Sequence, residues 1–208
     1  MTVKTGALAC AAALAVTAAG SAAAQSPSSQ KPLTEAQVRS FFDGMETQMT
    51  QWVNAGSADK LSGWLDKHTL DGAQFLYDTT TTVEERRVAS SQGTLGKDGL
   101  MKATSMLMGA GSPHGRIRDY KLDMTVNGVK LLSGGALAIV DADSRETGTI
   151  PRAKDSGAGS AGDQGAGSAG DQKDMQLTAA GQCRYFLVPG GGDTVQLATA
   201  ICQVDIQL

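Results

Sequence analysis

The chain has 208 residues, of which 41% are hydrophobic and 19% are charged, and its formal net charge at pH 7 is −3. This length suits one domain with its own hydrophobic core. The lysines and arginines are scattered and form no basic cluster. We therefore expect neither a nucleic-acid nor an anionic-membrane partner.

The N-terminal stretch MTVKTGALACAAALAVTAAGSAAAQ is typical of a secretory signal peptide. Lys4 precedes an apolar run, and the small residues 22–24 form an A-x-A cleavage site. We therefore expect a signal peptide over residues 1–24, cleavage after Ala24, and a periplasmic or secreted protein. The apolar run is shorter than the roughly 20 residues that a membrane span needs, so no transmembrane segment is expected.

A polar linker over residues 25–32 precedes a single domain that we expect over residues 33–208. Thr34 and Gln37 form a capping box for the first helix, and Leu33 and Val38 form its hydrophobic staple. Gly56 is the expected end of this helix. The apolar positions at helical spacing are Val38, Phe41, Phe42, Met45, Met49, Trp52 and Val53.

A second, shorter helix is expected after Ser57, with an apolar stripe of Leu61, Trp64, Leu65 and His68. A short strand is expected over residues 73–80. The third helix begins after the segment 95–99 and ends near Gly109 and Gly111. Its apolar face holds Leu100, Thr104, Leu107 and Met108.

Residues 116–132 alternate between apolar and polar side chains, with Tyr120, Leu122, Met124 and Val126 on the apolar face. Asn127-Gly128 could form a tight turn, but we expect a bulge or bend there and the turn at residues 133–135. A three-residue turn pairs positions whose numbers sum to 268 and places Arg145 opposite Asp123. Ala136, Ala138, Val140 and Ala142 then share the face of Tyr120.

The octapeptide GAGSAGDQ occurs twice in succession over residues 157–172, and each copy contains G-x-G-x-x-G. A dinucleotide loop would have to join a strand to a helix in a βαβ unit, whereas a strand pattern follows here. A calcium repeat would need apolar residues larger than alanine. We therefore predict a flexible Gly/Ser/Ala hairpin insertion at about residues 152–174.

Two final strands are expected over residues 176–188 and 195–208. Cleavage of the signal peptide removes Cys10 and leaves Cys183 and Cys202, an even count that favours a disulfide in an oxidising compartment. A closing pair of Gly190 and Val195 sets the two cysteines directly opposite each other at a non-hydrogen-bonded site. We therefore predict a cross-strand disulfide.

The sequence resembles the nuclear-transport-factor-2-like (NTF2-like) superfamily, in particular its SnoaL-like and ketosteroid-isomerase-like members. The resemblance is carried by the Phe/Trp-rich first helix, FLYDTTTT from Phe75, LGKDGLMKA from Leu95, IRDYKLDMTVNGV from Ile117, and QCRYFLV and ATAICQVDI near the end. It implies an α+β fold in which three N-terminal helices pack on a strongly curved, mainly antiparallel sheet and enclose a cone-shaped pocket. Functions in this superfamily include isomerases, hydrolases, polyketide cyclases, and non-catalytic binding or assembly domains.

The apolar faces predict which side chains line such a pocket. The expected ligand-pocket residues are Trp52, Trp64, His68, Tyr77, Tyr120 and Tyr185. The methionines that could add an adaptable apolar lining are Met45, Met49, Met101, Met106 and Met108. An isomerase-like mechanism needs a carboxylate base in the pocket, and we expect none there because the strand acids fall on the opposite face. Those acids are Asp78, Asp119, Asp123, Asp141 and Asp143.

Three functions follow as hypotheses. The leading one is non-catalytic binding of a small apolar or amphipathic molecule. The second is an isomerase, cyclase or hydrolase that uses His68, Asp43 or Glu46, with His68 the weak catalytic candidate. The third is an assembly or homodimer module that uses the outer sheet face, including Leu131, Leu137, Ile139, Leu197 and Ile201. No cofactor is expected, and His68 and His114 lack zinc-ligand spacing, so no metal site is expected.

Overall fold

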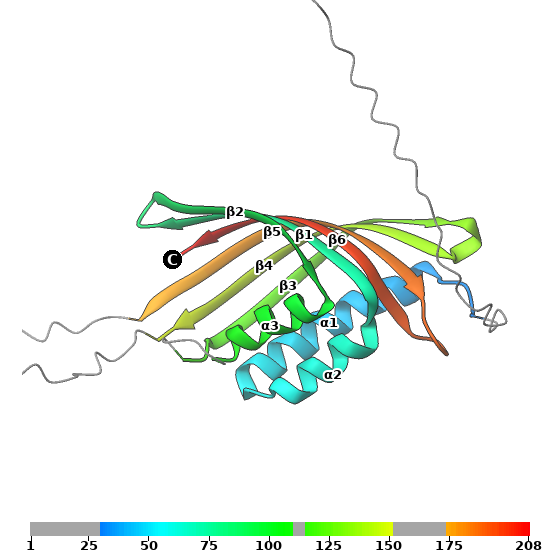
Figure 1. Ribbon diagram of the computed structural model, residues 1–208, viewed down its shortest axis with the longest axis horizontal. Helices are drawn as coiled ribbons and strands as arrows, with labels where there is room; N and C mark the ends of the chain where they lie inside the picture. Colours follow the sequence, from blue (N-terminus) through cyan, green and yellow to red (C-terminus); the bar gives the residue numbers. More distant parts are fainter. Residues whose placement is uncertain (1–29, 110–114, 152–173) are drawn as a thin grey trace, which may run out of the picture.

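The computed structural model describes residues 30–109, 115–151 and 174–208. The predicted signal peptide, residues 25–29 of the linker, Gly111, His114 and the two octapeptides lie outside the described residues. The elements in chain order are α1 (Glu35–Ala55), α2 (Ala58–His68), β1 (Thr69–Val83), β2 (Arg86–Gly96), α3 (Lys97–Leu107), β3 (Arg118–Leu132), β4 (Leu137–Ile150), β5 (Met175–Pro189) and β6 (Val195–Gln207) (Figure 1). None of the helices in these ranges is long and apolar enough to cross a membrane.

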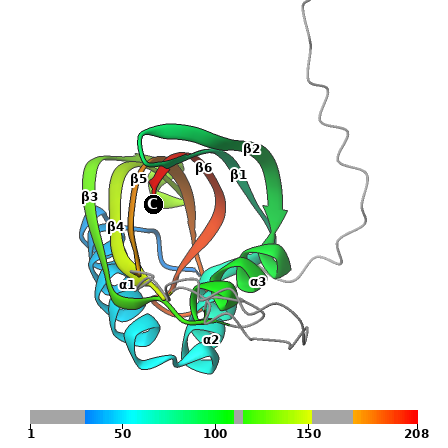
Figure 2. The ribbon, with the colours of Figure 1, turned by 90° about the vertical axis from the view of Figure 1, so that its left-hand side faces the viewer.

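The strands form one six-stranded sheet in the order β2-β1-β6-β5-β4-β3. β1 and β6 run parallel, and the other neighbouring strands run antiparallel. The sheet curls strongly, and the three helices lie along its concave side (Figure 2). The predicted α+β class, with N-terminal helices on a curved sheet, is confirmed.

Helix α1 begins and ends as its sequence predicts. The Thr34 hydroxyl accepts from the Gln37 backbone N–H, and the Gln37 side chain accepts from the Thr34 backbone N–H. Leu33 and Val38 are buried at this end. Gly56 ends the helix in the left-handed conformation at φ 67°, which costs glycine little.

Three side chains of α1 cover the free edge of β3. Glu46 accepts from the backbone N–H of Met124, Thr50 accepts from that of Leu122, and Asn54 bonds both backbone groups of Tyr120. Four residues of helix rise about 6 Å and two residues of strand about 6.6 Å, so the two repeats match. The helix therefore satisfies edge groups that would otherwise be open to another strand.

The structure corrects the prediction between α2 and α3. The expected short strand is β1, which is longer than predicted, and the sequence analysis missed β2 completely. The turn between them places Glu84 and Glu85 at positive φ without glycine or asparagine, so the usual hairpin signature is missing. β2 is polar and largely exposed, and it therefore lacks the alternation that marks a half-buried strand.

The β3–β4 hairpin has the predicted bulge. Asp123 lies opposite Arg145, and the register shifts between Val126 and Gly128. Nearer the turn the pairing differs from the prediction by one residue, because Leu132 pairs with Leu137 and the connection has four residues. The bulge restores the expected register from Val126 to Lys121, and the register shifts again between Lys121 and Arg118.

The β5–β6 hairpin contains the predicted disulfide. Cys183 and Cys202 are direct cross-strand partners, with their Cα atoms 4.2 Å apart and their sulfur atoms bonded. The predicted closing pair of Gly190 and Val195 is wrong, because Pro189 pairs with Val195 and the register shifts near Phe186. This shift turns Leu197 inward, where it is 8% exposed, and so corrects its predicted place on the outer face.

Candidate functional site

A cavity lies between the helices and the concave face of the sheet, with a volume of about 390 Å³. Its walls come from α1, α2, α3 and from strands β1, β3, β4, β5 and β6. The apolar residues at its surface are Phe41, Met45, Met49, Trp64, Leu65, Phe75, Leu100, Ala103, Leu122, Met124, Leu197, Ala200 and Val204, with Cys183 and Cys202. The polar residues are His68, Thr69, Thr104, Tyr120, Ser144, Glu146 and Tyr185.

Four of the six predicted pocket residues line this cavity, namely Trp64, His68, Tyr120 and Tyr185. Trp52 is half-buried on α1 and lies outside the lining. Tyr77 also lies outside it, because its ring covers Gly93 on β2: a Cβ at Gly93 would lie 2.7 Å from the Tyr77 hydroxyl oxygen. The role of the four lining residues as ligand contacts stays a prediction.

The cavity contains a carboxyl group that the sequence analysis missed. Residues 138–142 alternate inward on β4, and the same alternation carries Ser144 and Glu146 into the cavity. The Tyr120 hydroxyl donates to Oε2 of Glu146 at 2.9 Å. The expectation of a cavity without an acid is therefore wrong. The strand acids considered for the cavity ended at Asp143, and Glu146 lies three residues further along β4.

Burial changes the acidity of this pair. Desolvation raises the pKa of the Glu146 carboxyl above its ordinary value, and the Tyr120 hydrogen bond offsets part of that rise. The pKa of Tyr120 is raised well above its ordinary value by burial and by the nearby carboxylate. The pKa of Tyr185 is raised by burial first and by Glu146 second. Tyr120 and Tyr185 thus remain protonated hydroxyls at neutral pH beside a carboxyl that holds its proton more strongly than usual.

His68 is the second titratable group of the cavity wall. Its Nδ1 lies 2.8 Å from the backbone oxygen of Val195, and its ring stacks on Trp64 with centroids 4.7 Å apart. The ring of Phe41 lies beside the same imidazole, with the two ring centroids 5.7 Å apart. Burial lowers the pKa of His68, and neighbouring Lys67 lowers it further against the opposing effect of the hydrogen bond. The lowered pKa therefore favours the neutral form of the imidazole at pH 7.

The two helix-borne acids of the catalytic hypothesis lie outside the cavity lining. Asp43 is exposed on α1, and Glu46 binds the backbone of Met124 at 2.8 Å. Met45 and Met49 line the cavity as expected, and Met124 joins them. Met101, Met106 and Met108 do not line it, and Met106 is 51% exposed.

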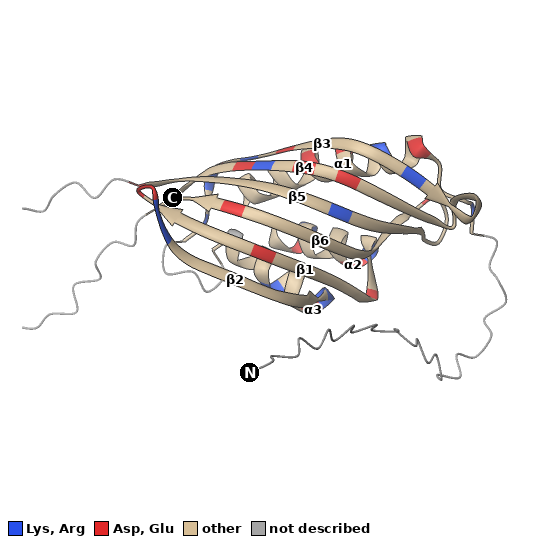
Figure 3. Cartoon of the chain, turned by 90° about the horizontal axis from the view of Figure 1, so that it is seen from above, with Lys and Arg blue, Asp and Glu red and all other residues tan. Residues whose placement is uncertain are grey.

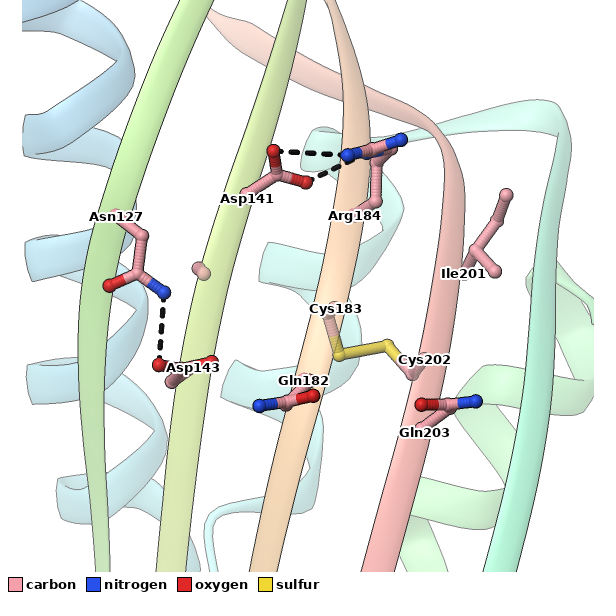
Figure 4. A pocket seen from close by; sticks show the side chains of 10 residues that line it. Asn127, Asp141, Asp143, Gln182, Cys183, Arg184, Ile201, Cys202 and Gln203 are labelled. Atoms are coloured by element: carbon pink, nitrogen blue, oxygen red, sulfur yellow. Dashed lines mark hydrogen bonds and ion pairs between the residues drawn. A yellow bond between two sulfur atoms is a disulfide. The ribbon is translucent and has the colours of Figure 1, made fainter.

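A shallow depression of about 410 Å³ lies on the outer face of the sheet (Figure 4). Four of its polar side chains form two pairs: Arg184 binds Asp141 at 2.7 Å, and Asn127 donates to Asp143 at 2.9 Å. Figure 3 shows that both acidic and basic residues occur along the strands of the sheet. A homodimer through this face stays a prediction, for which Ile201, at 46% exposed, remains a suitable contact.

Across residues 30–109, 115–151 and 174–208, no group of three or more histidine, cysteine, aspartate or glutamate side chains is arranged to hold a metal ion.

Solved structures with a similar fold include an NTF2-like protein from Cytophaga hutchinsonii, at 9% identity and a TM-score of 0.44 over 82% of this chain and 98% of that one. A ketosteroid isomerase-like protein from Erwinia carotovora matches at 12% identity and a TM-score of 0.39 over 82% and 92% of the two chains. A hexachlorocyclohexane dehydrochlorinase, LinA type 2, matches at 9% identity and a TM-score of 0.41 over 82% and 84%. At these identities and TM-scores, neither a family nor an activity carries over from these proteins to this chain. No protein-family model and no curated protein matches the sequence.

Proposed function

We propose that the protein binds a small apolar or amphipathic molecule in the cavity between helices and sheet. The observation that carries this proposal is an apolar cavity of about 390 Å³ that holds the Glu146–Tyr120 pair. Ligand sites typically measure about 300–1,000 Å³ and combine an apolar lining with a few polar groups that orient the ligand. Both features are present here, whereas the outer depression is shallow and its charged side chains are already bound, Arg184 to Asp141 and Asp143 by Asn127.

Binding can be tested with N-phenyl-1-naphthylamine, a neutral apolar dye whose fluorescence rises when it leaves water. We expect saturable binding to the full chain and a loss of at least about tenfold in affinity in Ala103→Trp, because Ala103, although exposed on α3, lines the cavity and a bulky ring there takes up space at its wall. Ala55→Trp is the matched control, since Ala55 is exposed at the end of α1 and lies outside the lining. Dye binding that is absent, or that Ala103→Trp leaves unchanged, would contradict the proposal.

Glu146 also favours a second candidate function, an acid–base enzyme of the isomerase, cyclase or hydrolase type. A carboxyl with a raised pKa beside tyrosine hydroxyls is suited to move a proton to or from a bound carbonyl compound. The test is hydrogen–deuterium exchange at the α-carbon of 2-tetralone, followed by NMR. Exchange that the full chain accelerates and that Glu146→Gln abolishes, with Asp143→Asn unchanged, would support catalysis; equal rates with and without protein would argue for binding alone.

We also infer export, supported by the signal-like N-terminal sequence and by the Cys183–Cys202 disulfide. N-terminal sequencing of protein recovered from outside the cytoplasm should begin at Gln25. A mature protein that retains residues 1–24 would contradict the cleavage.

A further inference from the structure

We infer that the cavity selects an organic ammonium ion, an apolar molecule with a protonated amine, over a carboxylate or phosphate of the same size. This inference rests on the proposed binding function. It follows from the hydrogen-bonding groups of the cavity wall. Three of its side chains, Glu146, His68 and Thr104, present hydrogen-bond acceptors and no free donor to a ligand.

Glu146 presents acceptors to the cavity. The Tyr120 hydroxyl has one proton, and that proton is donated to Oε2 of Glu146. A cation beside this carboxyl favours its ionised form, which has about four lone-pair positions on its two oxygens and no proton of its own. After the bond from Tyr120, the pair therefore still accepts hydrogen bonds from a ligand.

His68 has the same polarity. The carbonyl oxygen of Val195 cannot donate, so the hydrogen bond at 2.8 Å requires the proton on Nδ1 of His68. In a neutral imidazole the other nitrogen, Nε2, is then an acceptor. The ring is held in place by its stack on Trp64, so the tautomer and the orientation are fixed together.

Thr104 completes the set from α3. Its hydroxyl donates to the backbone oxygen of Leu100, one turn earlier in the helix, and leaves lone pairs as its remaining capacity. The other hydroxyls of the lining, on Thr69, Ser144 and Tyr185, can act in either sense. Hydrogen-bond partners fix the proton positions of Tyr120, His68 and Thr104. Each of these side chains can therefore only accept a hydrogen bond from a ligand.

The charge of the wall points the same way. The lining formed by the described residues contains one acid, Glu146, and no lysine or arginine. A ligand carboxylate beside Glu146 would place two like charges in a poorly solvated space, and one of them would have to take up a proton. An ammonium ion supplies donors and compensates the carboxylate, and the aromatic rings of Phe41 and Trp64 are compatible with a cation nearby.

The test compares three probes with the same chain length, n-octylammonium, 1-octanol and octanoate, by calorimetric titration into the full chain at pH 7. An alkylammonium is protonated at this pH, since lysine-like amines titrate at about 10. We expect octylammonium to bind about tenfold or more tightly than octanoate, with octanol between them, because a hydrogen bond to a charged partner has that effect.

Glu146→Gln and Asp143→Asn separate the cavity from the general charge of the protein. Both remove one negative charge from β4, but Asp143 lies on the outer face. We expect Glu146→Gln to bring octylammonium and octanoate to within about threefold of each other, and Asp143→Asn to leave their ratio unchanged. Equal binding of the three probes, or tighter binding of octanoate, would overturn this inference and leave the binding function intact. No saturable binding of any probe would count against both, and the dye titration would then decide whether the binding function itself fails.

Discussion

The two faces of β4 place similar carboxyl groups in opposite environments. Asp141 and Asp143 lie on the outer face, where Arg184 and Asn127 bind them in open solvent. Glu146, on the same strand, lies on the inner face beside Tyr120. The Arg184 guanidinium lowers the pKa of Asp141, whereas burial raises the pKa of Glu146. The difference shows that the face, and not the residue type, determines which acid is available for chemistry.

The largest expected difference between the faces is in packing. Leu187 is fully buried on the inner face of β5, and Leu187→Ala should lower the free energy of unfolding by about 2–5 kcal/mol. Phe186→Ala removes a larger side chain from the outer face of the same strand and should cost less, since Phe186 is half-buried. Urea unfolding of the two variants measures both losses, and an equal or greater loss in Phe186→Ala would break the comparison.

The disulfide joins β5 and β6, and its two cysteines line both the inner cavity and the outer depression. Replacing Cys183 and Cys202 together by alanine should lower the free energy of unfolding by about 3 kcal/mol, because the crosslink closes a loop across 19 residues. Thermal unfolding of the double variant and of the parent, each without reductant, measures the effect. Two titratable thiols in the exported parent protein would show that the bond does not form.

The pH dependence of stability should have opposite signs for the two faces. The folded-state pKa of Glu146 is raised, so its contribution is present below its ordinary pKa of 4.5 and is lost as pH rises through the raised value. The folded-state pKa of Asp141 is lowered, so its contribution is present above its ordinary pKa of 3.8 and is lost as pH falls through the lowered value.

Unfolding experiments from about pH 3 to about pH 9 separate these contributions, because the range includes the ordinary pKa values of both carboxyl groups and the pH above them. We expect the stability of Glu146→Gln relative to the parent to increase as the pH rises above 4.5. Asp141→Asn should match the parent at low pH and be slightly less stable at neutral pH. A stability difference for Glu146→Gln that is independent of pH would mean that the carboxyl is solvated.

The smallest expected effect is that of the outer ion pair itself. The side chains of Arg184 and Asp141 are 56% and 53% exposed, so solvent and salt screen their attraction. Arg184→Gln should leave the melting temperature nearly unchanged and leave dye binding unchanged. A clear loss of dye binding in this variant would show that the outer depression contributes to the site.

The sequence predicts the framework of the molecule because local signals determine it. The capping box at Thr34, the bulge after Val126 and the pairing of Cys183 with Cys202 each follow from residue types at short spacing. Hairpin registers depend on turn length, and there the prediction differed by one residue in both hairpins. In β6 that single residue reversed the face of Leu197.

The missed features have physical reasons. β2 is an exposed edge strand, so water, rather than a core, surrounds its side chains and no apolar alternation is required. Glu146 follows a run of mostly charged and polar residues on β4, a pattern typical of a solvent-exposed segment. Extending the alternation of Ala138, Val140 and Ala142 by two steps would have placed it inward. The hydrogen bond between Glu146 and Tyr120 joins residues 26 positions apart, so no local sequence pattern predicts it.

The most direct test of the binding site uses the methionine methyl groups as reporters. Met45, Met49 and Met124 line the cavity, and Met106 is exposed outside it. In the full chain labelled with ¹³C at the methionine methyls, titration with N-phenyl-1-naphthylamine should shift the Met45, Met49 and Met124 signals along one saturation curve and leave Met106 in place. A shift of Met106 without shifts of the three lining methionines would contradict the assignment of the cavity as the ligand site.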